Sequence, residues 1–348
     1  MRLAAIAEAL LTPHGIDRYL ELVHPMLVRR EIRGEVTAVE HQTADTVTLT
    51  LRPSSAWRGF RAGQYVRVSA DIDGVRRTRC YSPAGSQYRD GRLELTIKTQ
   101  GLVSQHLKRA RPGWVLGLSQ ADGGFTLPEP RPEKLVLISG GSGITPMMAM
   151  LRTLADEGYS GEVVFLHYAN TPADVLYADE LARQAAGVRV VLAYTHAEGG
   201  ELSGFFSREH LVAAAPWYAG ARTYLCGPAP LMESVRTLYD HEKLSAQLIT
   251  EEFTPPALTI DGSVAEGTVR FAHSGVEVPN SGRPLLEQAE AAGLRPEHGC
   301  RMGICFSCTK VKARGPVRDA RSGAVSGEEN EEIQLCISVP AGDVEINA

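Results

Sequence analysis

Four cysteines near the end of the sequence have the spacing of iron–sulfur ligands. Cys300, Cys305 and Cys308 form a C-x4-C-x2-C triplet, and Cys336 follows 28 residues after the third. Four thiolates at this spacing can hold the two irons and two sulfides of a plant-type 2Fe–2S cluster. Zinc and purely structural cysteines are the alternatives, but zinc usually takes ligands in closely spaced pairs. The spacing therefore predicts a 2Fe–2S site.

A second group of residues has the chemistry to hold a phosphorylated aromatic cofactor. Arg79-Cys80-Tyr81-Ser82 places a planar cation, a ring and a hydroxyl on one strand-like segment. The guanidinium suits a phosphate, and the ring can stack on a flat heterocycle. Downstream, residues 98–104 form a Gly-containing turn before a helical pattern, whose N–H groups can bind a pyrophosphate, with Ser104 expected at the N-cap. The alternatives are strand packing and an ordinary strand-to-helix turn.

A third group has the form of a dinucleotide site. The apolar run at residues 135–139 leads into Gly140-Gly141-Ser142-Gly143-Ile144-Thr145-Pro146, a turn that lets the backbone approach a pyrophosphate at a helix start. The turn differs from the G-x-G-x-x-G sequence of the Rossmann dehydrogenases. Another apolar strand ends in Cys226-Gly227-Pro228. For Cys226, a buried small hydrophobic residue is the alternative interpretation.

The elements that must position these residues differ along the chain. Short alternating runs dominate residues 34–128 and predict an antiparallel β-barrel. After that stretch, continuous apolar strands alternate with helical patterns, which indicates a parallel doubly wound α/β sheet. The expected strands are residues 134–139, 162–168, 188–194 and 223–226. Near the C-terminus, residues 268–272 and 276–279 read as a hairpin, and residues 284–292 as a helix.

These patterns divide the chain into five parts. We expect an N-terminal helical extension (1–33), a β-barrel that holds the second group of residues (34–128), a nucleotide-binding α/β domain (129–253), a linker (254–266) and an iron–sulfur domain (267–348). The chain of 348 residues is long enough for several domains. Its net charge of −5 favours no nucleic-acid partner. No run reaches the roughly 20 apolar residues of a transmembrane helix. Without a signal-peptide pattern, we expect a cytoplasmic protein.

Taken in order, the motifs resemble those of the ferredoxin reductase flavoprotein family that carries a C-terminal plant-type ferredoxin domain. The resemblance implies FAD on the barrel, with FMN as the alternative, and an α+β ferredoxin domain of the β-grasp type. It implies catalytic roles for Tyr81, Ser82 and Cys226, with Ser82 near flavin N5 and Cys226 beside the nicotinamide. The implied flavin-binding residues are Arg79, Tyr81, Ser82, Ile97, Lys98, Gly101, Leu102, Val103 and Ser104. The implied nucleotide-binding residues are Gly141, Gly143, Thr145, Pro146, Cys226, Gly227, Pro228 and Phe253.

The donor is NADPH or NADH. Discrimination between them depends on the residues that meet the adenosine 2′ position, expected just after the strand at residues 188–194. Thr195, His196 and Glu198 stand there, and Arg208 could reach inward from a nearby helix. This set favours NADPH. A two-electron donor and a one-electron cluster require a flavin between them, so the domain order predicts an electron path from NAD(P)H to the cluster.

Several classes of protein could accept the electrons from the cluster. Residues 10–20 resemble the start of reductases that serve membrane fatty acyl desaturases, which makes a desaturase the first expected partner and implies peripheral contact with a membrane. Reductases of Rieske-type or di-iron oxygenases, or of cytochromes P450, use the same set of domains. A redox sensor that holds flavin and cluster without turnover is the alternative outside enzymes. The apolar periodicity of residues 10–28 also fits a helix that only covers the barrel.

Overall fold

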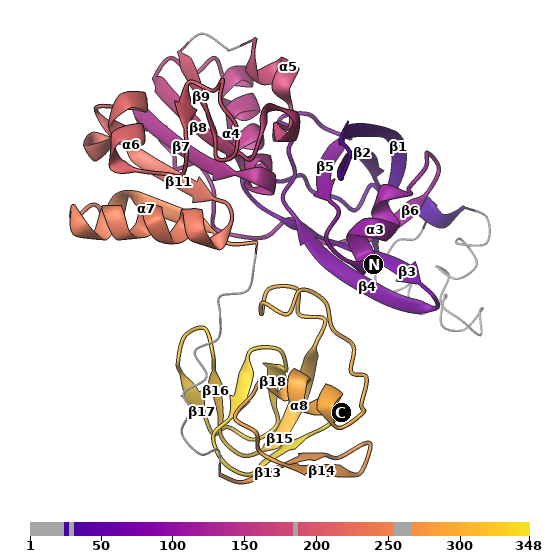
Figure 1. Cartoon of the computed structure of the whole chain (residues 1–348). Helices are drawn as coiled ribbons and strands as arrows, with labels where there is room; N and C mark the ends of the chain where they lie inside the picture. The colour runs from indigo at the N-terminus through magenta and orange to yellow at the C-terminus, as the bar shows by residue number, and fades with distance from the viewer. Residues whose placement is uncertain (1–23, 28–30, 184–186, 254–265) are drawn as a thin grey trace. The chain divides into compact units, whose positions relative to one another are not determined.

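The computed structural model describes residues 24–27, 31–183, 187–253 and 266–348 (Figure 1). The described residues form two compact units. The first runs to Ala70 and from Tyr81 to Phe253, and the second comprises Asp71–Cys80 with the chain from residue 266 to Ala348. The predicted N-terminal helix and linker lie almost entirely outside the described residues, apart from the 3-10 helix η1 (Pro25–Leu27). Within the described ranges, no helix has the length and apolar content needed to cross a membrane.

The barrel sheet is antiparallel, as predicted, and open at its edges. Its strands are β1 (Ile32–Thr43), β2 (Thr46–Pro53), β3 (Val66–Ile72), β4 (Val75–Tyr81), β5 (Leu93–Lys98) and β6 (Val115–Leu118), in the order β4-β3-β6-β1-β2-β5. Helix α3 (Leu102–Lys108) follows β5. Leu49 and Leu51 of β2 and Leu93 and Leu95 of β5 are fully buried, and most other residues of these two strands are buried as well. Burial of this apolar face holds the sheet in register.

The nucleotide domain contains the predicted parallel doubly wound sheet. Its strands are β7 (Lys134–Gly140), β8 (Glu162–Ala169), β9 (Val188–Tyr194), β10 (Leu202–Ser203), β11 (Arg222–Cys226) and β12 (Leu248–Glu251), in the order β10-β9-β8-β7-β11-β12. Every neighbouring pair is parallel. The chain moves outward from β7 through β9 and returns beside β7 at β11. The switch point of the sheet, where ligands usually bind, therefore lies between β7 and β11.

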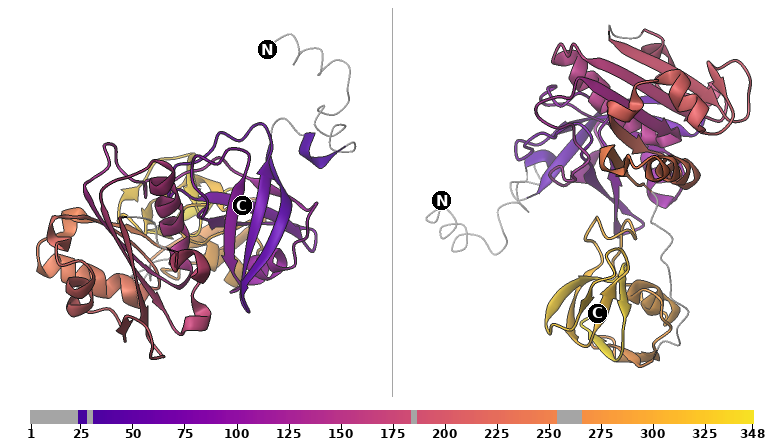
Figure 2. Two further views of the ribbon diagram at one scale, coloured as in Figure 1. Left: turned by 90° about the horizontal axis from the view of Figure 1, so that it is seen from above. Right: turned by 90° about the vertical axis from the view of Figure 1, so that its left-hand side faces the viewer.

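Helices cover both faces of this sheet (Figure 2). They are α4 (Ile144–Asp156), α5 (Ala178–Leu181), α6 (Arg208–Ala214) and α7 (Ala229–His241), with the 3-10 turns η2 (Gly141–Gly143), η3 (Pro172–Asp174), η4 (Tyr218–Gly220) and η5 (Ser245–Gln247). One core packs Met147 and Met150 of α4 against Leu137 and Phe165. The opposite core includes Tyr239 of α7. Burial of both faces explains why the strands are apolar without alternation.

The second unit carries a small mixed sheet and one helix. Its elements are β13 (Thr268–Phe271), β14 (Val276–Pro279), α8 (Leu285–Ala291), β15 (Thr309–Arg314), β16 (Val317–Asp319), β17 (Val325–Ser326), β18 (Glu331–Gln334), β19 (Ser338–Pro340) and β20 (Val344–Ile346). Five strands form the order β14-β13-β20-β15-β18, and three more form β17-β16-β19. The predicted hairpin is β13–β14, paired from Thr268↔Pro279 to Phe271↔Val276. Leu285, Leu286 and Ala289 of α8 are buried in the core beneath the sheet.

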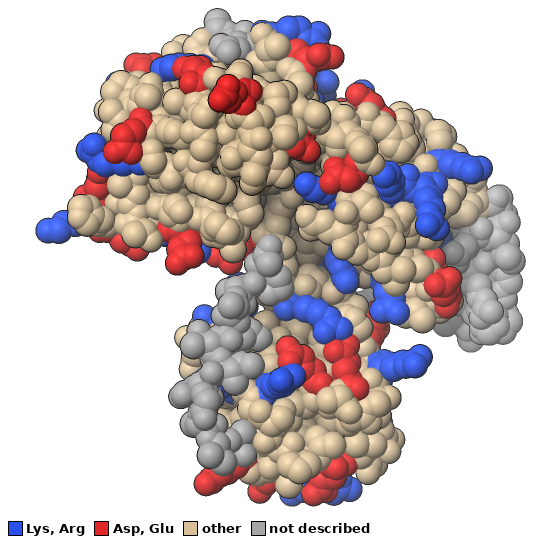
Figure 3. All heavy atoms as spheres, in the orientation of Figure 1, with Lys and Arg blue, Asp and Glu red and all other residues tan. Residues whose placement is uncertain are grey.

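Charged residues are distributed without one dominant sign. On the face drawn in Figure 3, lysine and arginine side chains are interspersed with aspartate and glutamate. The pattern agrees with the small net charge of −5 and gives no continuous basic surface on that face.

Candidate active site and cluster site

Cys300, Cys305, Cys308 and Cys336 all lie in the second unit. The pKa of the Cys305 thiol is raised chiefly by the neighbouring thiol of Cys300, and that of the Cys336 thiol by the neighbouring thiol of Cys308. Hydrogen bonding between the thiols lowers the pKa of Cys308 and raises that of Cys336. A 2Fe–2S cluster takes two protein ligands on each iron, so two pairs of thiols are the donor set it requires.

The loop that carries the first three cysteines has an unusual backbone. Arg301 (φ 60°) and Phe306 (φ 57°) occupy the left-handed region, which residues with a Cβ rarely adopt. Backbone N–H groups point at sulfur: Cys300 N–H donates to Cys305 Sγ at 3.1 Å, and Met302 N–H to Cys300 Sγ at 3.3 Å. A Cβ at Gly299 would come within 2.6 Å of Cys305 Sγ. The loop is thus shaped around its sulfur atoms rather than around regular secondary structure.

The geometry of the cysteines also bears on the zinc alternative. Nowhere in the described ranges do three or more His, Cys, Asp or Glu side chains gather as a single metal ion requires. Two neighbouring pairs of thiols would supply the four ligands that a 2Fe–2S cluster needs. The residues present therefore fit a 2Fe–2S cluster better than zinc.

The two predicted flavin segments are neighbours in the barrel. Pro83 bridges to Leu95 in antiparallel direction, and Ala84 N–H donates to Glu94 O at 2.9 Å. This direction takes Tyr81 back toward the end of β5 from which α3 begins. Arg79 and Tyr81, two positions apart on β4, face the same side of the strand. The strands β4 and β5 are at opposite ends of the sheet order, and the bridge just after β4 brings the ring-binding residues proposed from the sequence close to the segment proposed for the pyrophosphate.

The start of α3 differs from the prediction in one respect. Ser104 was expected at the N-cap, but Gly101 occupies that position and Ser104 is the third residue of the helix. Its Oγ accepts hydrogen bonds from Gly101 N–H at 3.0 Å and Gln100 N–H at 2.9 Å. The prediction was wrong because a serine can satisfy the chain before a helix from inside the first turn, as in a capping box. A Cβ at Gly101 would meet no atom within 4 Å, so open space adjoins this helix start.

The remaining residues of these segments have different surroundings. Ile97 and Val103 are buried in the barrel core, whereas Leu102 is half exposed. Lys98 lies 3.5 Å from Asp45 in a surface ion pair. Ile97 and Val103 thus support the fold of the segment, and Leu102 and Lys98 are the members of this group with exposed surface.

The Gly-rich turn and the Cys226-Gly227-Pro228 turn meet at the switch point of the nucleotide sheet. β7 and β11 are paired in register up to Ser139↔Cys226. A Cβ at Gly143 would lie 2.2 Å from the Cys226 carbonyl oxygen and 2.8 Å from Gly227 N. Only glycine permits this approach. Thr145 Oγ1 donates to Ser142 O at 3.2 Å, which fixes the turn at the start of α4, where Thr145 and Pro146 are buried.

A hydroxyl, a carboxyl and a thiol converge where the barrel meets this sheet. Ser82, one residue beyond β4, donates to Glu251 Oε2 at 3.3 Å. Glu251 ends β12 and pairs in register with Cys226 at the end of β11. Ser82 is 2% exposed and Cys226 is fully buried. Two strands of the nucleotide sheet and the residue after a barrel strand thus bring these polar residues to the junction of the two domains.

Burial controls the protonation of this cluster. It raises the pKa of Glu251 to about 8, although the hydrogen bond from Ser82 acts in the opposite direction. Burial, with smaller effects of the charges of Glu251 and Glu252, also raises the pKa of the Cys226 thiol well above its ordinary value. At neutral pH the Glu251 carboxyl therefore holds a proton and the thiol is neutral. Strongly shifted groups in such a position are typical of functional sites.

Glu251 is the site residue that sequence reasoning missed. From the sequence, a role was assigned to Phe253, two residues further on, but none to Glu251. Phe253 is 37% exposed at the end of the first unit. A glutamate at a strand end carries no signal of burial by itself, because its partner Ser82 is 169 residues away. Only the tertiary structure brings the two together.

Of the residues expected near the adenosine 2′ position, Thr195 and His196 follow β9 as predicted, whereas Arg208 is engaged elsewhere. Thr195 Oγ1 lies 2.9 Å from His196 Nδ1 and 3.2 Å from Asn170 Oδ1, directly after β9. Arg208 does not reach inward as the sequence suggested. Its Nε donates to Glu242 Oε1 at 2.7 Å, which holds the guanidinium against α7. The sequence predicted that Arg208 lies on a helix, but it gave no sign of the ion pair between Arg208 and Glu242, 34 residues away.

Three stretches of the chain match described protein families. Residues 33–126 match an oxidoreductase FAD-binding domain, residues 137–237 an oxidoreductase NAD-binding domain, and residues 270–341 a 2Fe-2S iron-sulfur cluster binding domain. These matches give the chain sites for FAD, for a nicotinamide nucleotide and for a 2Fe–2S cluster, in the order predicted.

Similar proteins share this arrangement over most of their length. An NADPH oxidoreductase of Mycobacterium tuberculosis is 34% identical over 98% of this chain and 90% of its own. A glycine betaine monooxygenase reductase subunit of Pseudomonas aeruginosa is 29% identical, covering 83% of this chain and 87% of its own. The solved structure of phthalate dioxygenase reductase covers 91% of this chain and 97% of its own with a TM-score of 0.59, at 22% identity. The last likeness concerns the fold.

Proposed function

Because the chain belongs to the ferredoxin reductase-type flavoproteins with a C-terminal 2Fe–2S domain, we propose that it passes electrons from NADPH through FAD and the cluster to a separate acceptor protein. The observation that carries this proposal is the convergence of Ser82, Glu251 and Cys226. It joins the end of the flavin strand to the switch point of the nucleotide sheet. A donor and a flavin bound to these segments would be neighbours.

When bound, the cofactors would supply the redox chemistry, namely the conversion of a two-electron donation by NADPH into one-electron transfers. The protein positions them. In this proposal Arg79 and residues 101–104 hold the FAD phosphates, and Tyr81 and Ser82 contact its ring. Gly141, Gly143, Thr145 and Pro146 hold the nucleotide, and Cys226-Gly227-Pro228 lies beside the nicotinamide. The half-buried Glu251 carboxyl accepts a hydrogen bond from Ser82 Oγ at 3.3 Å, and its raised pKa of about 8 would keep it protonated at neutral pH.

The experiment is rapid mixing of the oxidised protein with NADPH under anaerobic conditions, following the flavin and cluster absorbance separately. Flavin bleaching should come first and cluster reduction second. The redox-sensor alternative predicts no steady consumption of NADPH with ferricyanide or cytochrome c present. The oxidoreductase names of the relatives argue against a sensor. Bleaching of the cluster before the flavin would contradict the proposed path.

We propose NADPH as the preferred donor. The name of the Mycobacterium relative supports it, as do the hydrogen-bonding side chains of Thr195 and His196 after β9. Replacing His196 with Ala should lower kcat/KM for NADPH more than for NADH. Arg208→Ala should leave the ratio unchanged, because the guanidinium is engaged by Glu242. If Arg208→Ala instead lowers the ratio of kcat/KM for NADPH to that for NADH, the 2′-phosphate would be bound at α6.

The acceptor has two candidates. The oxygenase candidate is supported by the relative named as a monooxygenase reductase subunit. The desaturase candidate is supported by the resemblance of residues 10–20, which lie outside the described part of the chain. Product formation with each purified acceptor, a membrane desaturase and a soluble oxygenase component, would decide. Deletion of residues 1–23 should reduce coupling to the desaturase only.

A further inference from the structure

The segment that follows Ser82 lies along helix α4. Three side chains of the helix contact it. Arg152 Nη1 donates to Ala84 O at 2.9 Å, Gln87 N–H donates to Thr153 Oγ1 at 3.2 Å, and Tyr88 Oη–H donates to Glu157 Oε1 at 2.7 Å. We call these six residues the α4 seam. The seam joins the barrel to the nucleotide domain within the first unit.

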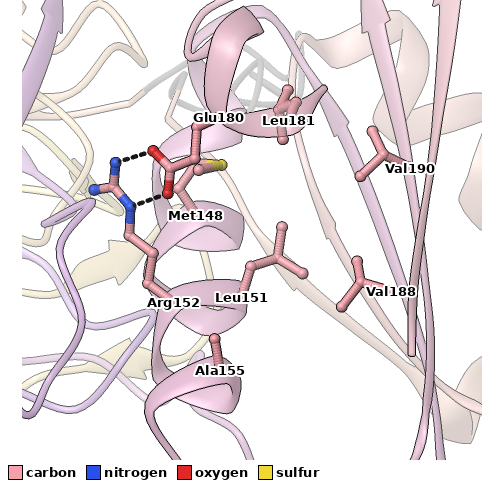
Figure 4. Close-up of a pocket in the computed structure, with 8 residues that line it drawn as sticks. All are labelled: Met148, Leu151, Arg152, Ala155, Glu180, Leu181, Val188 and Val190. Atoms are coloured by element: carbon pink, nitrogen blue, oxygen red, sulfur yellow. Dashed lines mark hydrogen bonds and ion pairs between the residues drawn. The ribbon is translucent and has the colours of Figure 1, made fainter. Parts of the chain in front are cut away.

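Arg152 makes the strongest contacts of the α4 seam. Its guanidinium donates to Glu94 Oε2 of β5 at 2.8 Å, and it binds Glu180 of α5 through two hydrogen bonds of 2.7 and 2.5 Å. Figure 4 shows the paired hydrogen bonds to Glu180 at one end of an apolar pocket. The side chain is 17% exposed. Burial alone would lower its pKa, but the hydrogen bonds and charges of Glu180 and Glu94 raise it, so Arg152 stays charged.

The contacts continue into the barrel through Tyr177. The guanidinium carbon of Arg152 lies 5.1 Å from the centre of the Tyr177 ring, a cation–π distance. The Tyr177 hydroxyl hydrogen-bonds to Thr96 of β5, whose Oγ1 lies 2.7 Å from Thr48 Oγ1 of β2. Tyr177 itself has a left-handed backbone, φ 58°. A residue held in that conformation indicates that the surrounding contacts fix its position.

The position of Arg152 along α4 gives these contacts a functional meaning. The helix begins at Ile144, directly after the Gly-rich turn, and Arg152 lies eight residues later. At 1.5 Å per residue this is about 12 Å of rigid helix. At the other end, Ala84 is two residues after Ser82. A short stiff connection thus runs from the predicted nucleotide turn to the predicted flavin strand.

We propose that Arg152 is a positioning residue that sets the separation between the flavin ring and the nicotinamide through the α4 seam. The inference rests on the hydride transfer from NADPH to FAD proposed above. Reacting atoms must come within about 3–3.5 Å, and a misplacement of about 1 Å can slow a reaction about 100-fold. A buried ion pair often contributes little net stability compared with apolar residues, so a role in geometry is a physical reason for its presence here.

The test uses two variants of Arg152 in the full chain with its cofactors. Arg152→Lys keeps the charge but cannot bind Ala84, Glu94 and Glu180 together, because an ammonium lacks the planar fork. Arg152→Met combined with Glu94→Gln removes the guanidinium and the charge of its buried partner on β5, whereas Glu180, whose side chain is 42% exposed, can be solvated by water. Arg314→Met is the matched control, since it breaks a 2.9 Å ion pair with Glu345 in the second unit.

The first readout separates positioning from binding. We expect flavin reduction at saturating NADPH to slow about 10- to 100-fold in the double variant and a few-fold in Arg152→Lys. The nicotinamide–flavin charge-transfer absorbance should weaken in parallel. FAD content and the Kd of NADP⁺ should stay within about two-fold of the parent. The control should match the parent in all four measurements. An unchanged reduction rate in both Arg152 variants would overturn the proposal, as would a loss explained by missing FAD.

The second readout does not depend on turnover. Hydrogen exchange of the protein without FAD should be about ten-fold faster at residues 84–88 in the double variant than in the parent. Unchanged exchange there would overturn the assignment of Arg152 as the link in the seam. If the parent itself shows no flavin reduction by NADPH or NADH, the proposed function fails, and this inference with it. If the parent reduces its flavin with NADPH and both Arg152 variants do so at the same rate, the proposed function stands and the positioning role of Arg152 fails.

Discussion

Glu251 places a carboxyl group between a hydroxyl from the barrel and a thiol from the nucleotide sheet. Burial raises its pKa to about 8, against an ordinary value of 4.5. The folded protein therefore binds a proton that the unfolded chain releases between these two pH values. Stability attributable to this group must fall as the pH rises from about 4.5 to 8 and then level off.

Replacing Glu251 with Gln should remove this dependence. The variant should have a thermal midpoint several degrees above the parent at pH 8.5 and about equal to it at pH 5, since a kcal/mol shifts the midpoint of a domain this size by about 2–4 °C. The pH profile of flavin reduction should also lose any step near pH 8. Glu252→Gln is the control, because Glu252 pairs with Arg236 at 2.6 Å and has no contact to Ser82. A parent whose midpoint rises between pH 5 and 8, relative to the Gln variant, would contradict the assignment.

The cysteine pairs predict which electron step depends on the second unit. Cys305→Ser should abolish the cluster absorbance and transfer to the acceptor protein, while flavin reduction by NADPH stays within about two-fold, because no cluster ligand belongs to the first unit. Arg314→Met is the control, because it changes a residue of the second unit outside the cysteine pairs. Equal loss of flavin reduction and acceptor reduction in Cys305→Ser would contradict a linear path.

The 2Fe–2S domain could be predicted from the sequence because the cysteine pattern that indicates it is local. Three of the four ligands lie within nine consecutive residues, and thiolates at that spacing have few uses. Glu251 and Arg152 could not be predicted. Each gains its surroundings from a contact across two domains, 169 residues apart for Ser82 and Glu251 and 68 for Ala84 and Arg152. In the sequence alone, this glutamate and this arginine cannot be distinguished from charged residues on the protein surface.

At the scale of elements, the close approach of two turns decides the nucleotide site. Gly143 sits at the start of α4 against the backbone of Cys226 and Gly227. Gly143→Ala should push the turns apart, and an overpacking cost of about 1–3 kcal/mol would weaken NADP⁺ binding about ten-fold or more. Calorimetric titration of the oxidised protein with NADP⁺ measures this directly.

Gly220→Ala is the matched control for this prediction. A Cβ at Gly220 would meet no atom within 4 Å, and the residue lies in the same domain. It should leave NADP⁺ affinity unchanged. Equal affinity in Gly143→Ala and the parent would show that the turn is not part of the nucleotide site.

The strands themselves were the most predictable elements. The predicted runs at residues 134–139, 162–168, 188–194 and 223–226 agree with β7, β8, β9 and β11 to within one residue at each end. Strands buried on both faces must be apolar throughout, so the pattern is strong. The start of α3 was less predictable, because Ser104 can hydrogen-bond to the preceding backbone from either the N-cap or the third helical position.

At the scale of the whole molecule, the order of the domains was evident from the order of the motifs. The FAD-binding, NAD-binding and 2Fe–2S family matches follow the predicted sequence along the chain. The joining of the barrel and the nucleotide domain into one compact unit was not evident. It depends on polar contacts such as those of the α4 seam, which no periodicity in the sequence reports.

Because the α4 seam joins the barrel to the nucleotide domain, we predict that these two domains unfold together. FAD binds the barrel, yet it should stabilise the nucleotide sheet as well, by RT ln(1 + [FAD]/Kd), about 2.7 kcal/mol at 100-fold excess over Kd. Trp57 and Trp114 lie in the barrel and Trp217 in the nucleotide domain, so a Trp57→Phe, Trp114→Phe protein reports on the latter alone. Its fluorescence midpoint should rise with added FAD. A midpoint indifferent to FAD would mean that the two domains melt independently. With the α4 seam intact, the fraction of protein that holds FAD would set the thermal stability of the nucleotide domain as well as that of the barrel.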